Sequence, residues 1–150
     1  MKQNMLGASL KTCHWGYFDA TLPPAMTISS GDEVVIDTVS GGPQNLPGAG
    51  YHVPQELLDL HAAGLPTMPG HILTGPIAVQ GAMPGDVLQI DILDVSLRQD
   101  WGFNYLGPLT GTLPQDFPNV HHTIIPLDVE RGIATLPWGP ELKLAPFFGV

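Results

Sequence analysis

The sequence predicts a mainly β protein, with antiparallel sheets in a sandwich-like or barrel-like arrangement, one short helix and long loops. Three observations favour this class. Apolar and polar residues alternate in several stretches, which is typical of half-buried strands. The 18 glycines and 16 prolines among the 150 residues indicate a chain rich in turns. Helical spacing of apolar residues occurs in one short segment.

Two similar stretches predict strands on either side of a Gly-Asp turn. They are AMTISSGDEVVID at residues 25–37 and IAVQGAMPGDVLQIDILD at residues 77–94. Glycine supplies a positive φ in such a turn and the aspartate bonds back to its backbone, so we interpret Asp32 and Asp86 as turn residues. The likeness is either a weak internal repeat or two uses of one turn. The expected strands are 26–28, 34–36, 77–79 and 87–94.

The helix is predicted over about 54–63. Three leucines within residues 57–60 form a short apolar face, Pro54 suits the first turn and Gly64 suits the C-terminal cap. We interpret His61, in the last turn, as structural, because a cation there is favoured by the helix dipole.

The rest of the sequence predicts two long loops rich in glycine and proline, followed by a C-terminal segment of short strands. Residues 38–55 and 98–123 are the expected loops, and the second carries aromatic residues. Residues 123–150 predict two or three short strands, with prolines at strand ends or edges.

The composition excludes several kinds of partner. With 14 acidic and 5 basic residues the chain has a net charge of −9, and it lacks the Lys and Arg clusters that bind nucleic acid or an anionic membrane surface. No apolar run reaches the roughly 18 residues of a membrane span, and the N-terminus does not resemble a signal peptide. A single cysteine, Cys13, favours a reducing compartment, so we expect a cytoplasmic protein.

Charged residues are 13% of the chain, against about 25% in typical domains. Either another polypeptide covers part of the surface, or uncharged Gly, Pro, Ser and Thr face the solvent. The apolar residues 146–150 favour the first interpretation, because the ends of a domain usually face water.

Among the six histidines none falls in a local zinc motif. His71 comes directly before an expected strand, which would hold it rigidly, and Thr74 follows it. His14 precedes Trp15 and a glycine, a setting found in pockets and in packed cores alike. The adjacent pair at 121–122 would point to opposite faces of a strand, and a solvated loop pair is the favoured interpretation.

Four segments of the sequence resemble, in order, the N-terminal half of the acetamidase/formamidase family. They are HWGYFDATLPPAMTISSGDEVVIDTVSG, GHILTGPIAVQGAMPGDVLQIDILDV, DWGFNYLGPLTGTLP and APFFGV. The resemblance spans about residues 13–150, and its most specific element is TGPIAVQGAMPGD. Family members often carry an acidic residue where this chain has Met83.

The resemblance implies a β-rich fold, hydrolysis of small aliphatic amides to ammonia and a carboxylate, and a divalent metal, with zinc or calcium as candidates. Members are about twice this length, and their later half carries Gly-Asn-Asp and Gly-Asp-Gly-His motifs that are absent here. We therefore expect residues 1–150 to be a single domain equivalent to the N-terminal half, from a fragment, a truncated product or a split enzyme, and incomplete by itself.

For this amidase we predict His14 and His71 as metal ligands or proton-transfer groups, with Thr74 orienting substrate or water and Trp15 and Asn104 lining the pocket. The expected partners are a small amide and either further copies of the chain or a complementary C-terminal chain. The alternative is a non-catalytic β-sandwich module for binding or assembly, which the low charge and the apolar C-terminus also favour.

Overall fold

A computed structural model describes residues 3–64 and 70–147. The chain forms two compact units, residues 1–44 with 54–90 and residues 45–53 with 91–150. Each unit has sheets of its own, and the predicted single domain stays a prediction. No helix among the described residues is long and apolar enough to cross a bilayer.

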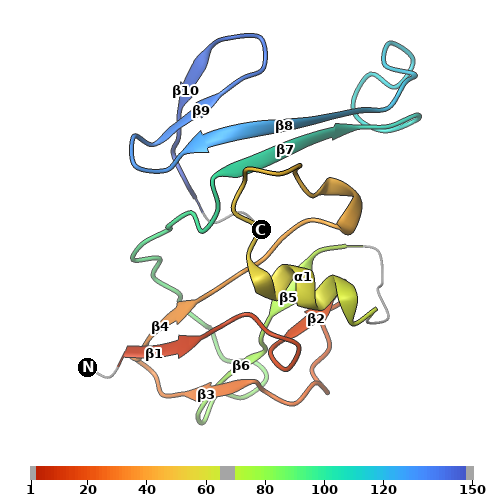
Figure 1. Ribbon diagram of the computed structural model, residues 1–150. Helices are drawn as coiled ribbons and strands as arrows, with labels where there is room; N and C mark the ends of the chain where they lie inside the picture. The colour runs from red at the N-terminus through yellow and green to blue at the C-terminus, as the bar shows by residue number, and fades with distance from the viewer. Residues whose placement is uncertain (1–2, 65–69, 148–150) are drawn as a thin grey trace. The chain divides into compact units, whose positions relative to one another are not determined.

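The first unit consists of three two-stranded ladders (Figure 1). Each joins strands that are far apart in the sequence. They are β1 (Gln3–Leu6) with β4 (Glu33–Ile36), β2 (Cys13–Trp15) with β5 (Ile72–Thr74), and β3 (Met26–Ile28) with β6 (Ile77–Val79). The β2–β5 ladder is antiparallel, as expected, whereas the other two are parallel.

Both predicted Gly-Asp turns are confirmed. In the first, the Ser29 N–H donates to the Asp32 carboxylate over 2.9 Å, and the Asp32 N–H donates to the Ser29 carbonyl over 3.1 Å. In the second, Met83 and Asp86 make the same two bonds, over 2.8 and 3.0 Å. The glycine of each turn has a positive φ, which explains its presence there.

The predicted helix is confirmed as α1 (Gln55–Ala62), which directly follows Pro54. Gly64 lies just beyond its end with φ +57°, a left-handed conformation that glycine adopts freely. Leu57 and Leu60 are buried and Leu58 faces outward. The two buried leucines are central to the small core of this unit, whose other members are Leu6, Ala8, Cys13 and Val39.

The second unit holds an antiparallel four-stranded sheet in the order β10-β9-β8-β7 (Figure 1). Its strands are β7 (Trp101–Leu106), β8 (His121–Asp128), β9 (Ile133–Thr135) and β10 (Glu141–Lys143). Trp101 is 1% exposed, and its indole N–H donates to the His52 carbonyl over 2.9 Å. The His52 N–H in turn donates to the Asp100 carboxylate over 2.9 Å. Two hydrogen bonds therefore attach the 45–53 segment to the start of β7. A short 3-10 helix, η1 (Pro43–Asn45), ends at the first residue of this segment.

Several sequence-based expectations were wrong. Residues 98–123 are not all loop, because Trp101, Phe103 and Tyr105 alternate along β7 and pair with β8. The histidines at 121 and 122 begin β8 instead of lying in a loop, since β7 provides hydrogen-bond partners there. One expected end-marking proline, Pro126, lies within β8.

The strand expected at 87–94 is also absent, and these residues are exposed without regular structure. Their alternation is suited to a strand, but none of the sheets formed by the described residues includes them. A pattern of side chains favours an extended conformation, and a neighbouring backbone is still needed to satisfy its hydrogen bonds. Conversely, β1 and β2 were not predicted from the sequence.

Replacing Leu57 by alanine is expected to lower the free energy of unfolding by about 2 to 5 kcal/mol, because the side chain is fully buried. Leu58→Ala, in the same helix but 37% exposed, should cost less than about 1 kcal/mol. Urea unfolding followed by circular dichroism measures both. Equal losses in the two variants would contradict this description of the core.

Candidate functional site

The β2–β5 ladder brings together four of the five predicted site residues. Its register pairs Cys13 with Thr74, His14 with Leu73 and Trp15 with Ile72. The pairing extends one step further, since the Gly16 N–H donates to the His71 carbonyl over 2.9 Å. His71 therefore lies directly before β5, and a strand follows it as the sequence predicted.

Strand alternation separates these residues onto two faces. Extending this alternation by the Gly16–His71 pair places His14 and His71 on one face as diagonal neighbours. Diagonal neighbours in an antiparallel ladder are typically about 7 to 8 Å apart. Trp15 and Thr74 share the opposite face. The ladder thus presents two imidazoles on one side and uses the other side for packing.

The His14 ring is held in place by the loop that follows β2. Its Nε2 lies 3.1 Å from the Tyr17 carbonyl oxygen, and the two rings meet edge to face with centroids 5.4 Å apart. Because a carbonyl can only accept, Nε2 carries the proton and Nδ1 is the basic nitrogen. His71 is exposed, so its imidazole is accessible to water and to a small ligand.

On the opposite face Thr74 links β5 to the segment after β4. Its hydroxyl donates to the Asp37 carbonyl over 2.9 Å, and its oxygen lies 3.5 Å from the Cys13 sulfur. The Cys13 thiol is buried and can donate to the Thr74 oxygen. The hydroxyl proton of Thr74 is therefore used within the protein.

Trp15 connects the ladder with α1, which lies beside β2 (Figure 1). Its indole N–H donates to the Gly70 carbonyl over 3.2 Å, and its ring centroid is 6.0 Å from that of His61. His61 Nε2 lies 3.0 Å from the Gly41 carbonyl oxygen, so this nitrogen also carries a proton. These contacts support the structural interpretation of His61. Its Nδ1 is buried without a hydrogen-bond partner.

Glycine at position 70 permits a close approach of two backbones beside the imidazole face. A Cβ there would lie 3.1 Å from the Gly16 Cα, and the φ of +141° is unfavourable for other residues. The neighbouring residue is His71, so this contact helps to fix where the His71 backbone lies.

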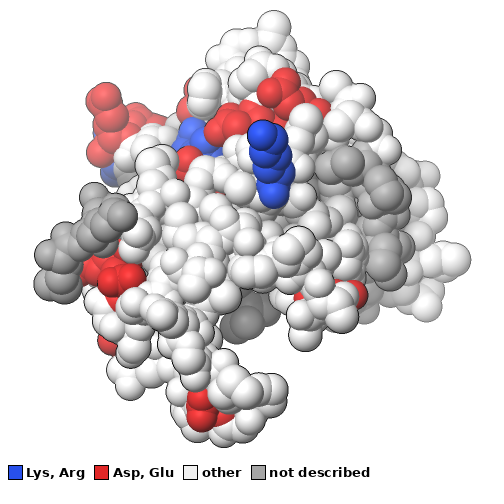
Figure 2. Space-filling model, turned by 90° about the horizontal axis from the view of Figure 1, so that it is seen from below, with Lys and Arg blue, Asp and Glu red and all other residues white. Residues whose placement is uncertain are grey.

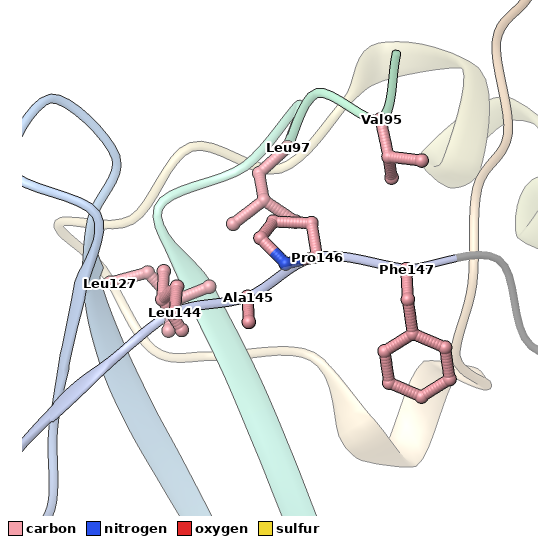
Figure 3. A pocket seen from close by; sticks show the side chains of 7 residues that line it. All are labelled: Val95, Leu97, Leu127, Leu144, Ala145, Pro146 and Phe147. Atoms are coloured by element: carbon pink, nitrogen blue, oxygen red, sulfur yellow. The ribbon is translucent and has the colours of Figure 1, made fainter. Parts of the chain in front are cut away.

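Asn104, the fifth predicted residue, belongs to the second unit. It is exposed on β7, opposite Thr123 of β8. An apolar hollow of about 310 Å³ is also found in this unit (Figure 3). It is lined by Val95, Leu97, Leu127, Leu144, Ala145, Pro146 and Phe147. No polar side chain lines this hollow, so no side chain there could act on an amide or a water molecule.

The described residues offer few donor groups for the predicted metal. Among residues 3–64 and 70–147 no group of three or more His, Cys, Asp or Glu side chains could hold a metal ion. Protein zinc sites use three or four side chains, and calcium requires oxygen ligands, so His14 and His71 do not form a complete site by themselves. The metal stays a prediction.

One carboxyl group in the loop after β2 has a clearly shifted pKa. The Thr21 backbone N–H and hydroxyl each donate to the Asp19 carboxylate over 2.7 Å, and these bonds lower the pKa of Asp19. Its two hydrogen bonds stabilise a local turn. The carboxylate is fully exposed, and its lowered pKa keeps a negative charge on the loop.

Comparison with known proteins adds two findings. The model of the acetamidase/formamidase family matches residues 8–134, a range that contains the whole β2–β5 ladder. A formamidase of Methylophilus methylotrophus is 48% identical over 59 residues, which are 36% of this chain and 14% of that protein. The chain therefore matches only a small part of the length of this relative.

Replacing Thr74 by valine is expected to lower the free energy of unfolding by about 1 kcal/mol, because the hydrogen bond to the Asp37 carbonyl is lost at nearly constant volume. Thr74→Ser keeps the hydroxyl and should retain most of the stability. Thermal and urea unfolding of both variants measure the difference. A valine variant as stable as the parent would show that this hydrogen bond contributes nothing.

Proposed function

Because the chain belongs to the acetamidase/formamidase family, we propose that it takes part in the hydrolysis of small aliphatic amides such as formamide or acetamide. The family match carries this proposal, and a partial relative that is named as a formamidase supports it. Within the matched range, the imidazole groups on the exposed face of the β2–β5 ladder are the functional groups best suited to the reaction.

Amide hydrolysis requires a base for the attacking water, a donor for the developing oxyanion and a proton for the leaving nitrogen. In the proposed reaction His71 accepts a proton from water while the oxygen adds to the amide carbon. The same imidazolium then returns the proton to nitrogen as the C–N bond breaks, and ammonia and a carboxylate leave. His14, which is held by Tyr17, supplies the second imidazole of the site. Backbone N–H groups stabilise the oxyanion.

Other parts of the proposed enzyme belong to further polypeptide. The 14% coverage of the relative supports a contribution from residues outside the matched stretch. Such residues would complete the ligands of a divalent metal, for which two imidazoles favour zinc over calcium. We propose that this further polypeptide comes from other copies of the chain or from a complementary chain. We also propose a cytoplasmic location.

A second candidate function is a non-catalytic module for binding or assembly. The observation that favours it is the number of large apolar side chains at the surface, among them Val87, Ile90 and Leu93, which are 96%, 70% and 73% exposed. Soluble proteins seldom leave such side chains contiguous and uncovered.

Ammonia release from formamide and acetamide by the purified chain, with and without added zinc, tests the amidase proposal. We expect His71→Ala to abolish release, because the proton acceptor is removed, and His52→Ala, an exposed histidine of the second unit, to retain it. NMR spectra of the histidine rings provide a second readout, in which added formamide should shift the His14 and His71 signals.

Two outcomes would overturn the proposal. One is a folded chain that neither releases ammonia nor shows shifted ring signals, which would favour the binding module. The other is release that survives His71→Ala at the parent rate, which would remove His71 from the reaction.

A further inference from the structure

His71 lies at one end of the β2–β5 ladder, directly before the first residue of β5, and its side chain is exposed. Among residues 3–64 and 70–147 no hydrogen bond or ion pair to its imidazole is found. The ends of short two-stranded ladders open readily in water. The position of this imidazole therefore depends on what holds the backbone of residues 70 and 71.

Two consecutive residues at the end of β2 hold this backbone. The Trp15 indole N–H donates to the Gly70 carbonyl over 3.2 Å. The Gly16 backbone N–H donates to the His71 carbonyl over 2.9 Å. The carbonyl groups before and after the His71 Cα are thus bound by different residues. The two glycines also approach closely, because a Cβ on residue 70 would lie 3.1 Å from the Gly16 Cα.

The tryptophan is itself held on the packing face of the ladder. Trp15 is half-buried, and its ring centroid is 6.0 Å from that of His61 in α1. The His61 ring is fixed in turn by the bond from its Nε2 to the Gly41 carbonyl over 3.0 Å. An indole has one donor and no acceptor, so its hydrogen bond has a single direction. A connected set of contacts therefore runs from α1 through Trp15 to the peptide group that precedes His71.

The faces of the ladder decide between two roles for Trp15. The sequence predicted that it lines the pocket. Alternation places it on the face opposite to His14 and His71, and the polar atom of its side chain is bonded to the Gly70 carbonyl. A substrate held by the two imidazoles would lie on the other side of the ladder. This geometry favours a residue that holds the backbone over one that contacts substrate.

A carboxylate is the common alternative for orienting a functional histidine. Acidic groups are scattered among uncharged side chains on the face shown in Figure 2. None is bonded to the His71 imidazole in the part of the chain that the structure describes. The contacts to the backbone of residues 70 and 71 are therefore the restraint that the described residues provide.

We infer that Trp15 is a positioning residue for His71, that it acts through the Gly70 peptide group, and that Gly16 assists it from the neighbouring backbone. The inference rests on the proposed amide hydrolysis, in which His71 accepts a proton from the attacking water. A general base must lie within hydrogen-bond reach of that water, and a small displacement of a catalytic group lowers the rate steeply. The indole supplies this restraint from the face opposite to the substrate.

The substitution Trp15→Phe tests this role, because it keeps an aromatic ring beside His61 and removes the indole N–H. Trp138→Phe is the matched control, since Trp138 is 71% exposed and belongs to the second unit. NMR relaxation of the full chain measures the backbone order parameter at His71. We expect it to fall from about 0.85, a value typical of rigid backbone, to below about 0.6 in Trp15→Phe. Trp138→Phe should leave it unchanged.

The rate of ammonia release from formamide separates positioning from contact with substrate. A loss of orientation acts on the chemical step, so Trp15→Phe should lower kcat at least about tenfold and leave KM within about twofold of the parent value. Trp138→Phe should retain both constants. Circular dichroism gives the folded fraction of each variant, to which the rates are normalised.

A second pair of variants changes the same restraint without altering the tryptophan. Gly70→Ala places a Cβ against the Gly16 Cα at a φ of +141°. Gly31→Ala, at a φ of +86° with no heavy atom within 4 Å of the new Cβ, strains the backbone elsewhere in the same unit. We expect the order parameter at His71 to fall in Gly70→Ala and to stay at the parent value in Gly31→Ala.

Three results would overturn the inference. The first is an unchanged order parameter at His71 in Trp15→Phe. The second is an equal fall in Trp138→Phe. The third is a Trp15→Phe variant whose KM rises while kcat is retained, which would make Trp15 a contact of the substrate. A parent chain that releases no ammonia overturns the amidase proposal alone, because the order parameter still decides whether Trp15 holds His71.

Discussion

Backbone pairing between strands that are distant in the chain is the constraint on which the first unit depends. Each of its ladders has two strands of three or four residues, and isolated ladders of this size are marginally stable in water. They belong to a unit whose small core contains Leu57 and Leu60 of α1 together with Leu6 of β1 and Cys13 of β2. Thr74 also links the β2–β5 ladder to the segment after β4. The loss of one partner strand would therefore expose backbone as well as side chains.

The candidate site is a consequence of this pairing. His14 and His71 come from segments nearly sixty residues apart, and only the antiparallel register of β2 and β5 places them on one face. The opposite face packs against the rest of the unit, through the Cys13–Thr74 contact and the Trp15–His61 ring contact. This division leaves the imidazole face available for chemistry, because neither histidine is needed to fill the core.

The same constraint explains why so much apolar surface is uncovered. Residues 87–94 are the clearest instance, because their apolar and polar residues alternate but they belong to none of the sheets formed by the described residues.

The features that the sequence determined by itself are local. The turns at Asp32 and Asp86, the helix ended by Gly64 and the mainly β class follow from bonds within a few residues and from side-chain periodicity. The family was also visible in contiguous motifs. For the candidate site, the sequence indicated the residue types and the strand that follows His71.

Only the tertiary structure decided which segments pair. It shows β7 where a loop was expected and no strand at 87–94. It also places Trp15 and Thr74 on the face opposite to His14 and His71. The physical reason is that a strand is stable only beside another backbone. Which backbone becomes that neighbour depends on the packing of the whole unit. The alternation of side chains along one segment does not specify its partner strand.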